Sequence, residues 1–443
     1  MKPTRYYPTN WRKYQAELKR AARHKRLLTR LALLSSILGC VFVGLFIYYS
    51  TGEPPSGDSN QPSHQPITSA QKLNIWPEMV PRKALSDYLI SRVNEPPRDI
   101  DQFIFEKDGY RFKITTTLDS NLQKYINRLL KRSRTLQAAV VILNPSDGRI
   151  LAMANRDTVG NTDNLCLKAD FPAASLFKIV SAAAALEAAG YTLDQALSYQ
   201  GSRHTLYKYQ LKDSKGPYSA PTNFRKAFAN SNNSVFGKIG IYALGQKIIE
   251  EYAEKFLFNK SIPFDLPVAV STAEVPEDDF GLAEIASGFN KRTLVSPLHA
   301  ALLSAMVVNS GGMKTPWIVS SIADGANKIV YSARNSVLNS PIDKKTAADL
   351  KTLMQYAASY GTTRSAFRKL RRQKTFADFV LGAKTGTIND KQDRFKYDWI
   401  TAFALAPDGA RGICVGILAV HGEKLGTRAT EFARAIINYY FGS

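Results

Sequence analysis

The sequence predicts an α+β fold: an antiparallel sheet flanked by helices, with a helical subdomain, preceded by one transmembrane helix. Three observations predict it. Strand-like apolar segments lie near both ends of residues 113–443, helical segments lie between them, and an uncharged apolar run precedes this region. A hydrophobic content of 44% over 443 residues is typical of a globular chain that buries a substantial core.

The N-terminal residues have the charge pattern of a membrane anchor. Residues 1–30 hold ten lysines and arginines and one acid, Glu17, whereas Leu31–Tyr49 contains no charge. A helix of this length spans roughly 28 Å, close to the thickness of a bilayer's hydrocarbon core. The basic flank predicts a single-pass protein of the cytoplasmic (inner) membrane, with its N-terminus inside and the rest of the chain extracytoplasmic or periplasmic.

Two other interpretations of this segment remain. A basic arm can bind nucleic acid, but the apolar run at its end argues against that, and we expect no nucleic-acid partner. A cleaved signal peptide normally has a shorter apolar core, and no clear cleavage site follows Tyr49.

Composition divides the chain into five parts. Residues 50–72 are rich in Pro, Ser, Gly and Gln, which predicts a flexible tether. We interpret residues 73–112 as a short linker or pedestal of unknown role, with one short helix at Arg82–Val93. The predicted order is a basic cytoplasmic segment 1–30, a transmembrane helix 31–49, the tether 50–72, the linker 73–112 and a compact domain 113–443.

The compact domain begins and ends with strands and a helix. Its first part predicts a strand at Tyr110–Thr117, a helix at Ser120–Arg132, and strands at Ala138–Leu143 and Ile150–Ala154 joined by a turn. Pro172–Gly190 is apolar on nearly all sides and predicts a central buried helix. Residues 191–300 are helix-rich, and the last part predicts strands at Val380–Lys384, Trp399–Ala406 and Gly412–Val420 and a helix at Ala429–Tyr440.

Ser175-Leu-Phe-Lys178 opens the central helix and is the first of three polar strings that suit one acyl-transfer site. Positions i and i+3 share a helix face, and the unbonded N–H groups of a first turn favour negative charge at the serine. Lys178 can act as a base only when neutral, a state that burial and a nearby cation both favour. The string alone is weak, because Ser69-Ala-Gln-Lys72 repeats it in the tether, and an N-cap serine with a surface lysine is the alternative.

Ser231-Asn-Asn233 is the second string. Taken alone it is a polar loop or a helix cap. Beside a serine–lysine pair, Ser231 can pass a proton between the lysine and a leaving amine. Asn233 can donate to a substrate carbonyl and hold the lysine in place.

Lys384-Thr-Gly-Thr387 is the most specific string, and it follows a predicted strand. The lysine supplies charge that orients a carboxylate and lowers the pKa of the first lysine. Thr385 and Thr387 offer hydroxyls to that carboxylate, and Gly386 leaves room for a substrate against the strand edge. The backbone N–H groups of Ser175 and Thr387 are the expected oxyanion pair. A strand-end turn with solvated polar residues is the alternative.

Other reactive residues are few. No Cys or His cluster has metal-ligand spacing, so we expect no metal and no cofactor. Cys414 lies in an apolar run and reads as a core residue, and a disulfide between Cys166 and Cys414 stays open. Arg368–Arg372 with Lys374 is a candidate patch for an anionic envelope, with a solvated helix face as the alternative.

The three strings, in this order, resemble those of penicillin-binding protein transpeptidase domains over about residues 113–441. Further segments resemble the same family: Thr115–Gln123, Val140–Ala154, Val295–His299, Val308–Gly312 and Gly361–Thr363. This family of serine acyltransferases includes D,D-transpeptidases, D,D-carboxypeptidases and serine β-lactamases. The resemblance implies a β-lactamase/transpeptidase-like fold and a membrane-anchored, monofunctional type.

The resemblance also implies roles for the residues that match. Ser175 would be the acylated nucleophile and Lys178 its base, with Ser231 and Asn233 as the second motif and Lys384, Thr385, Gly386 and Thr387 as the strand motif. There are departures. Ala174 and Leu176 stand where many members have Gly and Thr, and Asp398-Trp-Ile400 replaces a Trp-Phe pair after a polar insertion, Asn389–Asp398. None of them removes a catalytic group.

The function that the resemblance implies is a peptidoglycan D,D-transpeptidase, which cross-links stem peptides ending in D-Ala-D-Ala through a serine acyl-enzyme and is acylated by β-lactams. One alternative is a D,D-carboxypeptidase or β-lactamase that uses the same serine. Another is a non-catalytic β-lactam sensor or cell-wall scaffold. The expected partners are stem peptides, β-lactams, the cytoplasmic membrane and cell-wall synthesis proteins.

Overall fold

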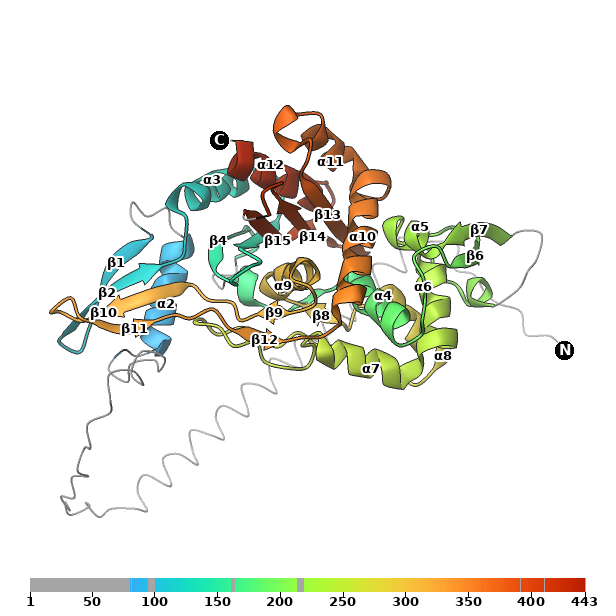
Figure 1. The fold of residues 1–443 in the computed structure, drawn as a ribbon, viewed down its shortest axis with the longest axis horizontal. Helices are drawn as coiled ribbons and strands as arrows, with labels where there is room; N and C mark the ends of the chain where they lie inside the picture. The colour runs from blue at the N-terminus through green and yellow to red at the C-terminus, as the bar shows by residue number, and fades with distance from the viewer. Residues whose placement is uncertain are drawn as a thin grey trace, which may run out of the picture. The chain divides into compact units, whose positions relative to one another are not determined.

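The computed structural model describes residues 80, 82–94, 100–160, 164–212, 219–390, 392–409 and 411–442. Their architecture is α+β, as predicted (Figure 1). The predicted basic segment 1–30, anchor 31–49 and tether 50–72, with the second serine–lysine string, lie outside these residues. Within the described ranges, no helix has the length and apolar character needed to cross a bilayer.

A five-stranded antiparallel sheet is the centre of the fold, in the order β13-β14-β15-β3-β4. Both of its faces are buried. On β3, Val140 packs into the core on one face and Val141 into the core on the other, and both are 0% exposed. Strands buried on both faces read as continuous apolar runs, and this is why the sequence revealed them. Their bounds are β3 (Gln137–Leu143), β4 (Ile150–Asp157), β13 (Val380–Asn389), β14 (Lys396–Leu405) and β15 (Gly412–His421).

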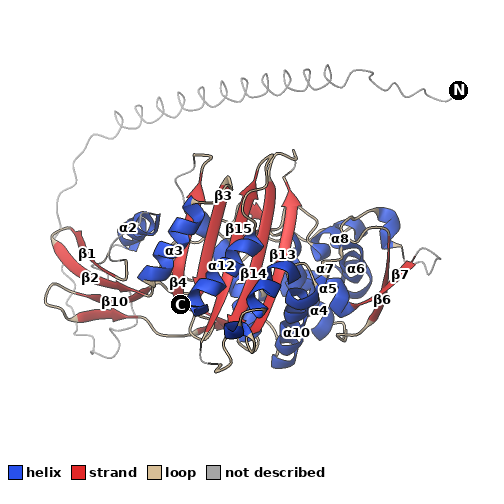
Figure 2. Cartoon of the chain, turned by 90° about the horizontal axis from the view of Figure 1, so that it is seen from above, coloured by secondary structure: helices blue, strands red, loops and turns tan. Residues whose placement is uncertain are grey.

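Helices cover both faces of this sheet (Figure 2). The apolar helix α9 (Pro297–Val308) packs on one face; Ser296 caps its first turn and Pro297 occupies the first helical position, as helix starts favour. On the other face lie α3 (Ser120–Lys131) and α12 (Ala429–Gly442), with α11 (Arg364–Arg371) against α12.

A helical region adjoins strand β13, which is one edge of the sheet (Figures 1 and 2). Its elements are α4 (Lys178–Glu187), the hairpin β6 (Ala196–Gln200) and β7 (Ser219–Asn223), α5 (Phe224–Ala229), α6 (Asn233–Ile239), α7 (Gly245–Lys255), α8 (Asp279–Ser287) and α10 (Lys344–Tyr360). Helix α10 contacts β13 directly, and α4 lies against α6, α7 and α8. All but one of the residues of α4 are buried, as its apolar sequence predicts.

A second, four-stranded sheet has the order β1-β2-β10-β11. Its strands are β1 (Gln102–Lys107), β2 (Tyr110–Thr116), β10 (Val319–Ala323) and β11 (Ile329–Ser332), with helix α2 (Arg82–Asn94) close to the predicted Arg82–Val93. The ring of Tyr88 on α2 lies 5.1 Å from that of Phe103 on β1. The predicted domain division stays a prediction, but its boundary at residue 113 falls within β2. The short strands β5 (Phe171–Pro172) and β8 (Leu294–Val295), and β9 (Met313–Lys314) and β12 (Val337–Asn339), form two further pairs.

Two features noted in the sequence take a definite form in the structure. The polar residues of 389–398 belong to a hairpin, because β13 runs to Asn389 and pairs it with Lys396 at the start of β14. Ile388 is buried between the exposed Thr387 and Asn389, which is the alternation of a half-buried strand. Cys166 and Cys414 are free, buried thiols, so the disulfide left open by the sequence is absent. Burial raises the pKa of each to about 12.

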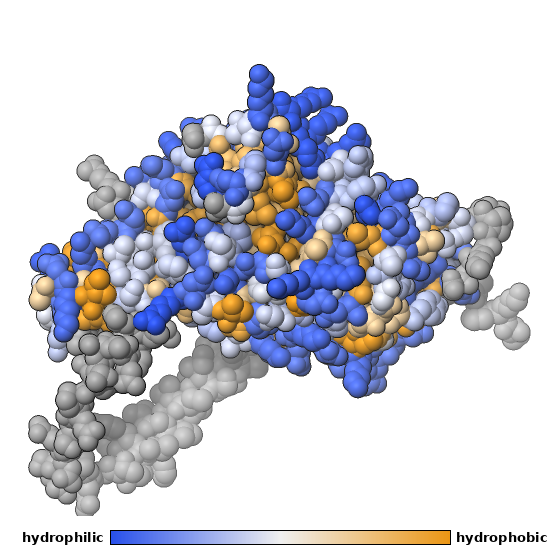
Figure 3. All heavy atoms as spheres, viewed as in Figure 1, coloured by the Kyte–Doolittle hydropathy of each residue, from blue (hydrophilic) through white to orange (hydrophobic). Residues whose placement is uncertain are grey.

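The basic run after residue 364 lies on α11. Leu370 is fully buried, whereas Arg368, Lys369 and Arg372 are exposed. Figure 3 shows hydrophilic side chains gathered at the top of the view, where Figure 1 places this helix. The alternation of one buried apolar residue among cations is that of an amphipathic helix with a solvated face.

Candidate active site

Ser175 lies in a tight turn rather than in the first turn of an α-helix. Ala174–Phe177 form a 3-10 turn that leads directly into α4, where the sequence predicted one continuous helix. Ala174 has a φ of +48°, a conformation that glycine adopts more readily. A side chain in the left-handed region costs about 1–2 kcal/mol, so the alanine before Ser175 holds the turn at some cost in stability.

Contacts from distant segments hold this turn. The indole Nε1 of Trp399 on β14 donates to the carbonyl oxygen of Pro172 at 2.9 Å, and the indole is fully buried. Gly288, at the end of α8, passes against the turn on another side. A Cβ atom at Gly288 would lie 2.0 Å from the carbonyl oxygen of Ala174, so only glycine fits there.

Lys178 is fully buried directly behind the serine. Its Nζ lies 2.9 Å from Ser175 Oγ and 2.8 Å from Asn233 Oδ1, and it also donates to the carbonyl oxygen of Ser287. A neutral amine has two N–H donors and one lone pair. It can therefore donate to the two carbonyl oxygens and accept from the serine hydroxyl, which leaves no hydrogen-bonding capacity unused.

The electrostatics of the site favour that neutral form. Burial, and then the charge of Lys384, hold the pKa of Lys178 well below its usual value of 10.5. Burial also lowers the pKa of Lys384, to about 7. The two amines titrate as a coupled pair. A neutral Lys178 beside a cationic Lys384 agrees with the contacts of both.

Ser231 and Asn233 come from the junction between α5 and α6. Ser231 has a φ of +55°, and the side chain of Asn232 caps α6. Asn233 Nδ2 donates to the carbonyl oxygen of His204 at 2.9 Å. A carbonyl can only accept, so this bond orients the amide and directs Oδ1 towards Lys178.

Lys384 joins the second string to the third. It is fully buried on β13, and its Nζ donates to Ser231 Oγ at 2.9 Å and to the carbonyl oxygen of Thr385 at 2.8 Å. The hydroxyl of Thr385 lies 2.7 Å from that of Thr362. Thr362 precedes α11 and was not among the residues that the sequence singled out, although it lies in the segment 361–363 noted for its resemblance.

Glycine is needed at position 386 for packing, as well as for the substrate space that the sequence predicts. A Cβ atom there would lie 3.1 Å from Ala174 Cβ and 3.2 Å from Ser175 N, closer than side chains normally approach. The glycine therefore lets β13 pack against the nucleophile turn. Thr387, one residue on, is exposed and faces the cleft.

A buried carboxylate, for which the sequence analysis predicted no role, supports Thr387. Thr387 Oγ1 donates to Asp398 Oδ1 at 3.2 Å, and the backbone N–H of Ala429 donates to Asp398 Oδ2 at 3.1 Å. Arg428 Nε lies 3.4 Å from the same carboxylate, which is 2% exposed. Burial alone would raise the pKa of Asp398, but the nearby His421 ring, the charge of Arg428 and these N–H groups together lower it.

His421 lies on the other side of Asp398. Gly426 N–H donates to its Nδ1 at 3.0 Å, so the proton of a neutral ring is on Nε2. Nε2 lies 3.7 Å from Asp398 Oδ2, which is beyond an ordinary hydrogen bond. Asp398, at which the sequence departs from the family pattern, therefore places a carboxylate beside Thr387 of the strand motif.

These groups open into one cleft of about 1080 Å³. Ser175, Ser231, Asn233, Thr385 and Thr387 line it, whereas Lys178, Lys384 and Gly386 lie behind its wall. The rim is basic: two carboxylates, Asp393 and Glu431, face a larger set of cations comprising Arg203, Lys291, Arg364, Lys369, Lys396, Arg428 and Arg434. Such a cleft attracts anionic ligands. Among the described residues, no group of three or more His, Cys, Asp or Glu side chains is placed to hold a metal ion.

The chain is similar in sequence to known proteins. The sequence profile described as "Penicillin binding protein transpeptidase domain" matches residues 138–438. Stage V sporulation protein D of Bacillus subtilis is 24% identical over 323 residues, which are 69% of this chain and 48% of the relative. Peptidoglycan D,D-transpeptidase PbpA of Mycobacterium tuberculosis is 27% identical over 384 residues, which are 77% of this chain and 74% of the relative. The chain thus spans about half the length of the first of these relatives.

Solved structures show the same fold. The D,D-transpeptidase domain of a peptidoglycan glycosyltransferase from Eggerthella lenta matches with a TM-score of 0.62 at 22% identity, over 74% of this chain and 82% of that one. The imipenem acyl-enzyme complex of penicillin-binding protein A from M. tuberculosis matches with a TM-score of 0.61 at 24% identity, over 74% of this chain and 79% of that one. At these identities the likeness establishes the fold.

Proposed function

The chain belongs to the penicillin-binding protein transpeptidase family, and we therefore propose that it is a serine-type peptidoglycan D,D-transpeptidase that β-lactams acylate. The observation that carries this proposal is the buried contact of 2.9 Å between Lys178 Nζ and Ser175 Oγ. The names of the relatives and the acyl-enzyme complex of the M. tuberculosis protein support it.

In the first half-reaction, Ser175 Oγ attacks the carbonyl carbon of the penultimate D-Ala of a donor stem peptide. Lys178 accepts the hydroxyl proton, and the carbonyl π bond becomes an oxyanion facing the backbone N–H groups of Ser175 and Thr387. Collapse of this intermediate breaks the peptide bond. The proton passes through Ser231 to the leaving nitrogen, so that D-Ala departs as an amine and an ester remains on Ser175.

In the second half-reaction, an amine of a second stem peptide attacks that ester. Lys178 and Ser231 take the amine proton, the new peptide bond forms, and the proton returns to Ser175 Oγ as the ester breaks. Lys384 and the hydroxyl of Thr385 hold the carboxylate of the donor before acylation, and Asn233 donates to a donor carbonyl. Asp398 fixes the hydroxyl of Thr387, which makes it a positioning residue.

Rapid hydrolysis by a carboxylate base has little support in the described part of the cleft. Rapid hydrolysis of the ester needs a carboxylate or another base that positions a water. Asp393 and Glu431 are the two acids among the described residues of the cleft, and Glu431 Oε2 already accepts the backbone N–H of Arg428 at 3.1 Å. Neither of them contacts Ser175 or Lys178 through a hydrogen bond in the described part of the chain. D,D-carboxypeptidase activity, β-lactamase activity and a purely sensory role remain outcomes that the experiment distinguishes.

The test uses the full chain in detergent micelles, a fluorescent penicillin, and then a stem-peptide donor with an amine acceptor. The wild type and the Ser69→Ala variant, which removes the serine of the repeated string, should both be labelled. The Ser175→Ala variant should not be labelled. Labelling that survives Ser175→Ala would overturn the assignment of the nucleophile.

The products decide among the remaining activities. A cross-linked peptide supports transpeptidation. Release of D-Ala with only the shortened donor would make the enzyme a carboxypeptidase, and rapid loss of the bound penicillin would make it a β-lactamase. Labelling without any product would leave a sensor or scaffold, and the proposed activity would be wrong.

The coupled lysines predict a bell-shaped pH profile for acylation. At low pH Lys178 is protonated and cannot accept the serine proton, so the rate rises with pH. As pH rises through about 7, Lys384 loses the charge that holds the carboxylate, so the rate falls. The measurement is the second-order rate constant of acylation by a penicillin and by the same penicillin with its carboxylate esterified. The alkaline limb should disappear with the ester, and an alkaline limb shared by both would assign it to another group.

We also propose that residues 31–49 anchor the protein in the cytoplasmic membrane, with residues 1–30 inside, 50–72 as a tether, 73–112 as a linker and 113–443 outside. The charge pattern of the first two segments supports this topology. In intact cells, a membrane-impermeant reagent should label a cysteine introduced at Ser63 and not one introduced at Ser36 or Thr9. Equal labelling at Thr9 and Ser63 would contradict it.

A further inference from the structure

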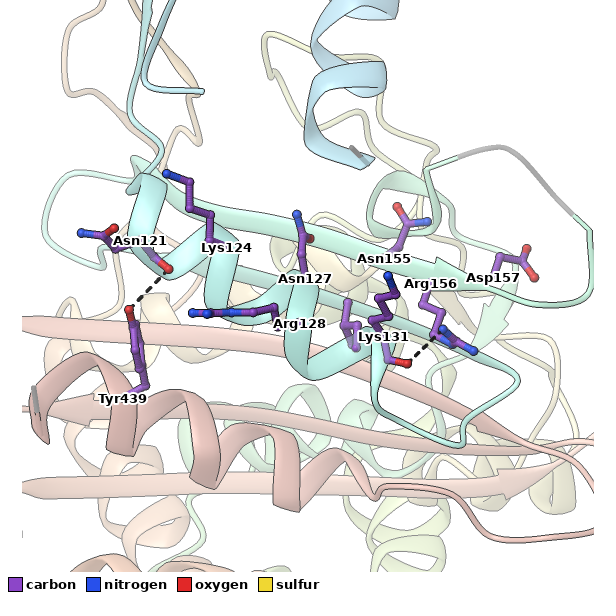
Figure 4. Close-up of a pocket in the computed structure, with 10 residues that line it drawn as sticks. Asn121, Lys124, Asn127, Arg128, Lys131, Asn155, Arg156, Asp157 and Tyr439 are labelled. Atoms are coloured by element: carbon purple, nitrogen blue, oxygen red, sulfur yellow. Dashed lines mark hydrogen bonds between the residues drawn. The ribbon is translucent and has the colours of Figure 1, made fainter. Parts of the chain in front are cut away.

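A second cavity lies at the edge of the main sheet opposite the candidate active site. Its volume is about 610 Å³, and its walls are α3, the end of β4 and one residue of α12 (Figure 4). Strand β4 is one edge of the five-stranded sheet and β13, with the third string, is the other. No residue of this cavity lines the active-site cleft, so the two are separate features.

The cavity has a strong excess of positive charge. Lys124, Arg128 and Lys131 project from one face of α3, since their spacings are four and three residues, and Arg156 adds a fourth cation from β4. Asp157 is the single acid of the lining, and its oxygens accept from Gln137 Nε2 and the backbone N–H of Val159. Among the described residues, no ion pair neutralises Arg128, Lys131 or Arg156.

A solvated helix face is the simpler explanation, and it accounts for part of the pattern. Arg128 and Lys131 lie in the last turn of α3, where cations interact well with the helix dipole. This does not explain Lys124, in the middle of the helix, or Arg156, on a strand. Nor does it explain why the cations border a hollow rather than a convex surface.

Three buried polar atoms of the lining lack partners. Asn127 Nδ2, Asn155 Oδ1 and Arg156 Nε are shielded from solvent and make no hydrogen bond. A buried polar atom that stays unsatisfied destabilises the folded protein. Figure 4 shows Lys124, Asn127 and Asn155 projecting to the same side of α3 and β4. The amides of Asn127 and Asn155, each with a donor and an acceptor, line the cavity beside several cations. Such a lining suits hydroxyl groups, which both donate and accept, next to an anionic group.

We propose that this groove binds an anionic glycan, a chain of sugar or sugar-alcohol units, through phosphate or carboxylate groups on the cations and hydroxyl groups on the two amides. Tyr439 closes one end, with its ring stacked on Tyr125 at 3.9 Å. This flat aromatic pair offers an apolar face to a sugar unit. The site would hold the protein on an anionic polymer independently of the chemistry at Ser175.

The probes distinguish binding of phosphate groups, carboxylate groups and uncharged sugars. The full chain in micelles is titrated with a short poly(ribitol phosphate), a polygalacturonate of similar length, a neutral chitin oligosaccharide and a polyglutamate peptide, at two salt concentrations. Binding of the first or the second identifies phosphate or carboxylate as the group recognised, and either outcome supports the proposal. Equal binding of the neutral sugar would overturn the role of charge, and equal binding of polyglutamate would overturn the role of the hydroxyls.

Two matched variants test whether the polymer binds at this groove. Arg128→Ala/Lys131→Ala removes two exposed cations from the last turn of α3. Arg368→Ala/Arg372→Ala removes two exposed cations from the last turn and cap of α11, so the change in net charge is the same. The groove variant should bind roughly 10- to 100-fold more weakly, as expected for the loss of charge-assisted hydrogen bonds. The control variant should bind as the wild type does.

Equal weakening in both variants, or no binding of either anionic polymer to the wild type, would overturn the proposal. Both variants should keep the fluorescent-penicillin labelling of Ser175, which also shows that they are folded. A protein that binds the polymer but is not labelled would refute the proposed enzyme and leave this site standing, so the two failures are distinguishable.

Discussion

Replacing Lys178 by methionine is expected to slow acylation of Ser175 by about 10²- to 10⁴-fold, the contribution of a positioned general base. Methionine is similar in length and apolar, so it fills the same buried space but cannot accept the proton. It also leaves Asn233 Oδ1 and the Ser287 carbonyl without their donor. The measurement is the rate constant of labelling by a fluorescent penicillin, together with the thermal unfolding of the same preparation.

Lys238 supplies the control. It lies on α6, is partly buried, and donates to the carbonyl oxygen of Ser198 at 3.4 Å. Lys238→Met removes a helix lysine of similar kind that does not line the cleft, and its labelling rate should match the wild type. A Lys178→Met protein that is folded and labelled within tenfold of the wild-type rate would show that another group is the base.

Gly288→Ala is expected to reduce both stability and acylation. Gly288 has a φ of +64°, and a Cβ atom there would lie 2.0 Å from the carbonyl oxygen of Ala174 and 3.0 Å from Ser175 N. The left-handed backbone alone costs an alanine about 1–2 kcal/mol. The clash adds to that, and the nucleophile turn must move to relieve it. A displacement of about 1 Å at a reacting group can cost about 10²-fold in rate.

Gly190→Ala separates the two contributions. Gly190 follows α4 with a φ of +66°, and nothing lies within 4 Å of the position that a Cβ atom would take. It should lose only the conformational cost and keep the wild-type rate of labelling. The measurements are denaturant unfolding of the full chain and the labelling rate of both variants. Equal losses in the two alanine variants would contradict the account of the turn.

Much of the main sheet could be predicted because burial leaves a local mark. Strands β3 and β15 are buried on both faces, so their sequences are continuous apolar runs, and helix α3 has one apolar face. The second sheet could not be predicted in this way. Its strand β2 was recognised, but its neighbour β10 is about 200 residues away in sequence, and β11 has no fully buried residue. Such pairing depends on the path of the chain rather than on local propensity.

The candidate site likewise combines features that the sequence predicts with contacts that only the fold reveals. Each string contains the atoms that its chemistry needs, and the sequence alone determined that a serine, two lysines, an amide and a glycine-bearing strand are present in order. Asp398 beneath Thr387 could not be read from local patterns because it depends on the register of the β13–β14 hairpin. Gly288 against Ala174 could not be read because the contact joins residues far apart in the chain.

What the tertiary structure alone decided is the state of Lys178. Full burial and a second lysine brought beside it by β13 hold its pKa well below the usual value and favour the neutral amine. A pKa depends on the charges and the solvent around a group, and these are fixed only when distant segments meet. The sequence therefore predicted the reactive groups, and the fold determined which of them can accept a proton.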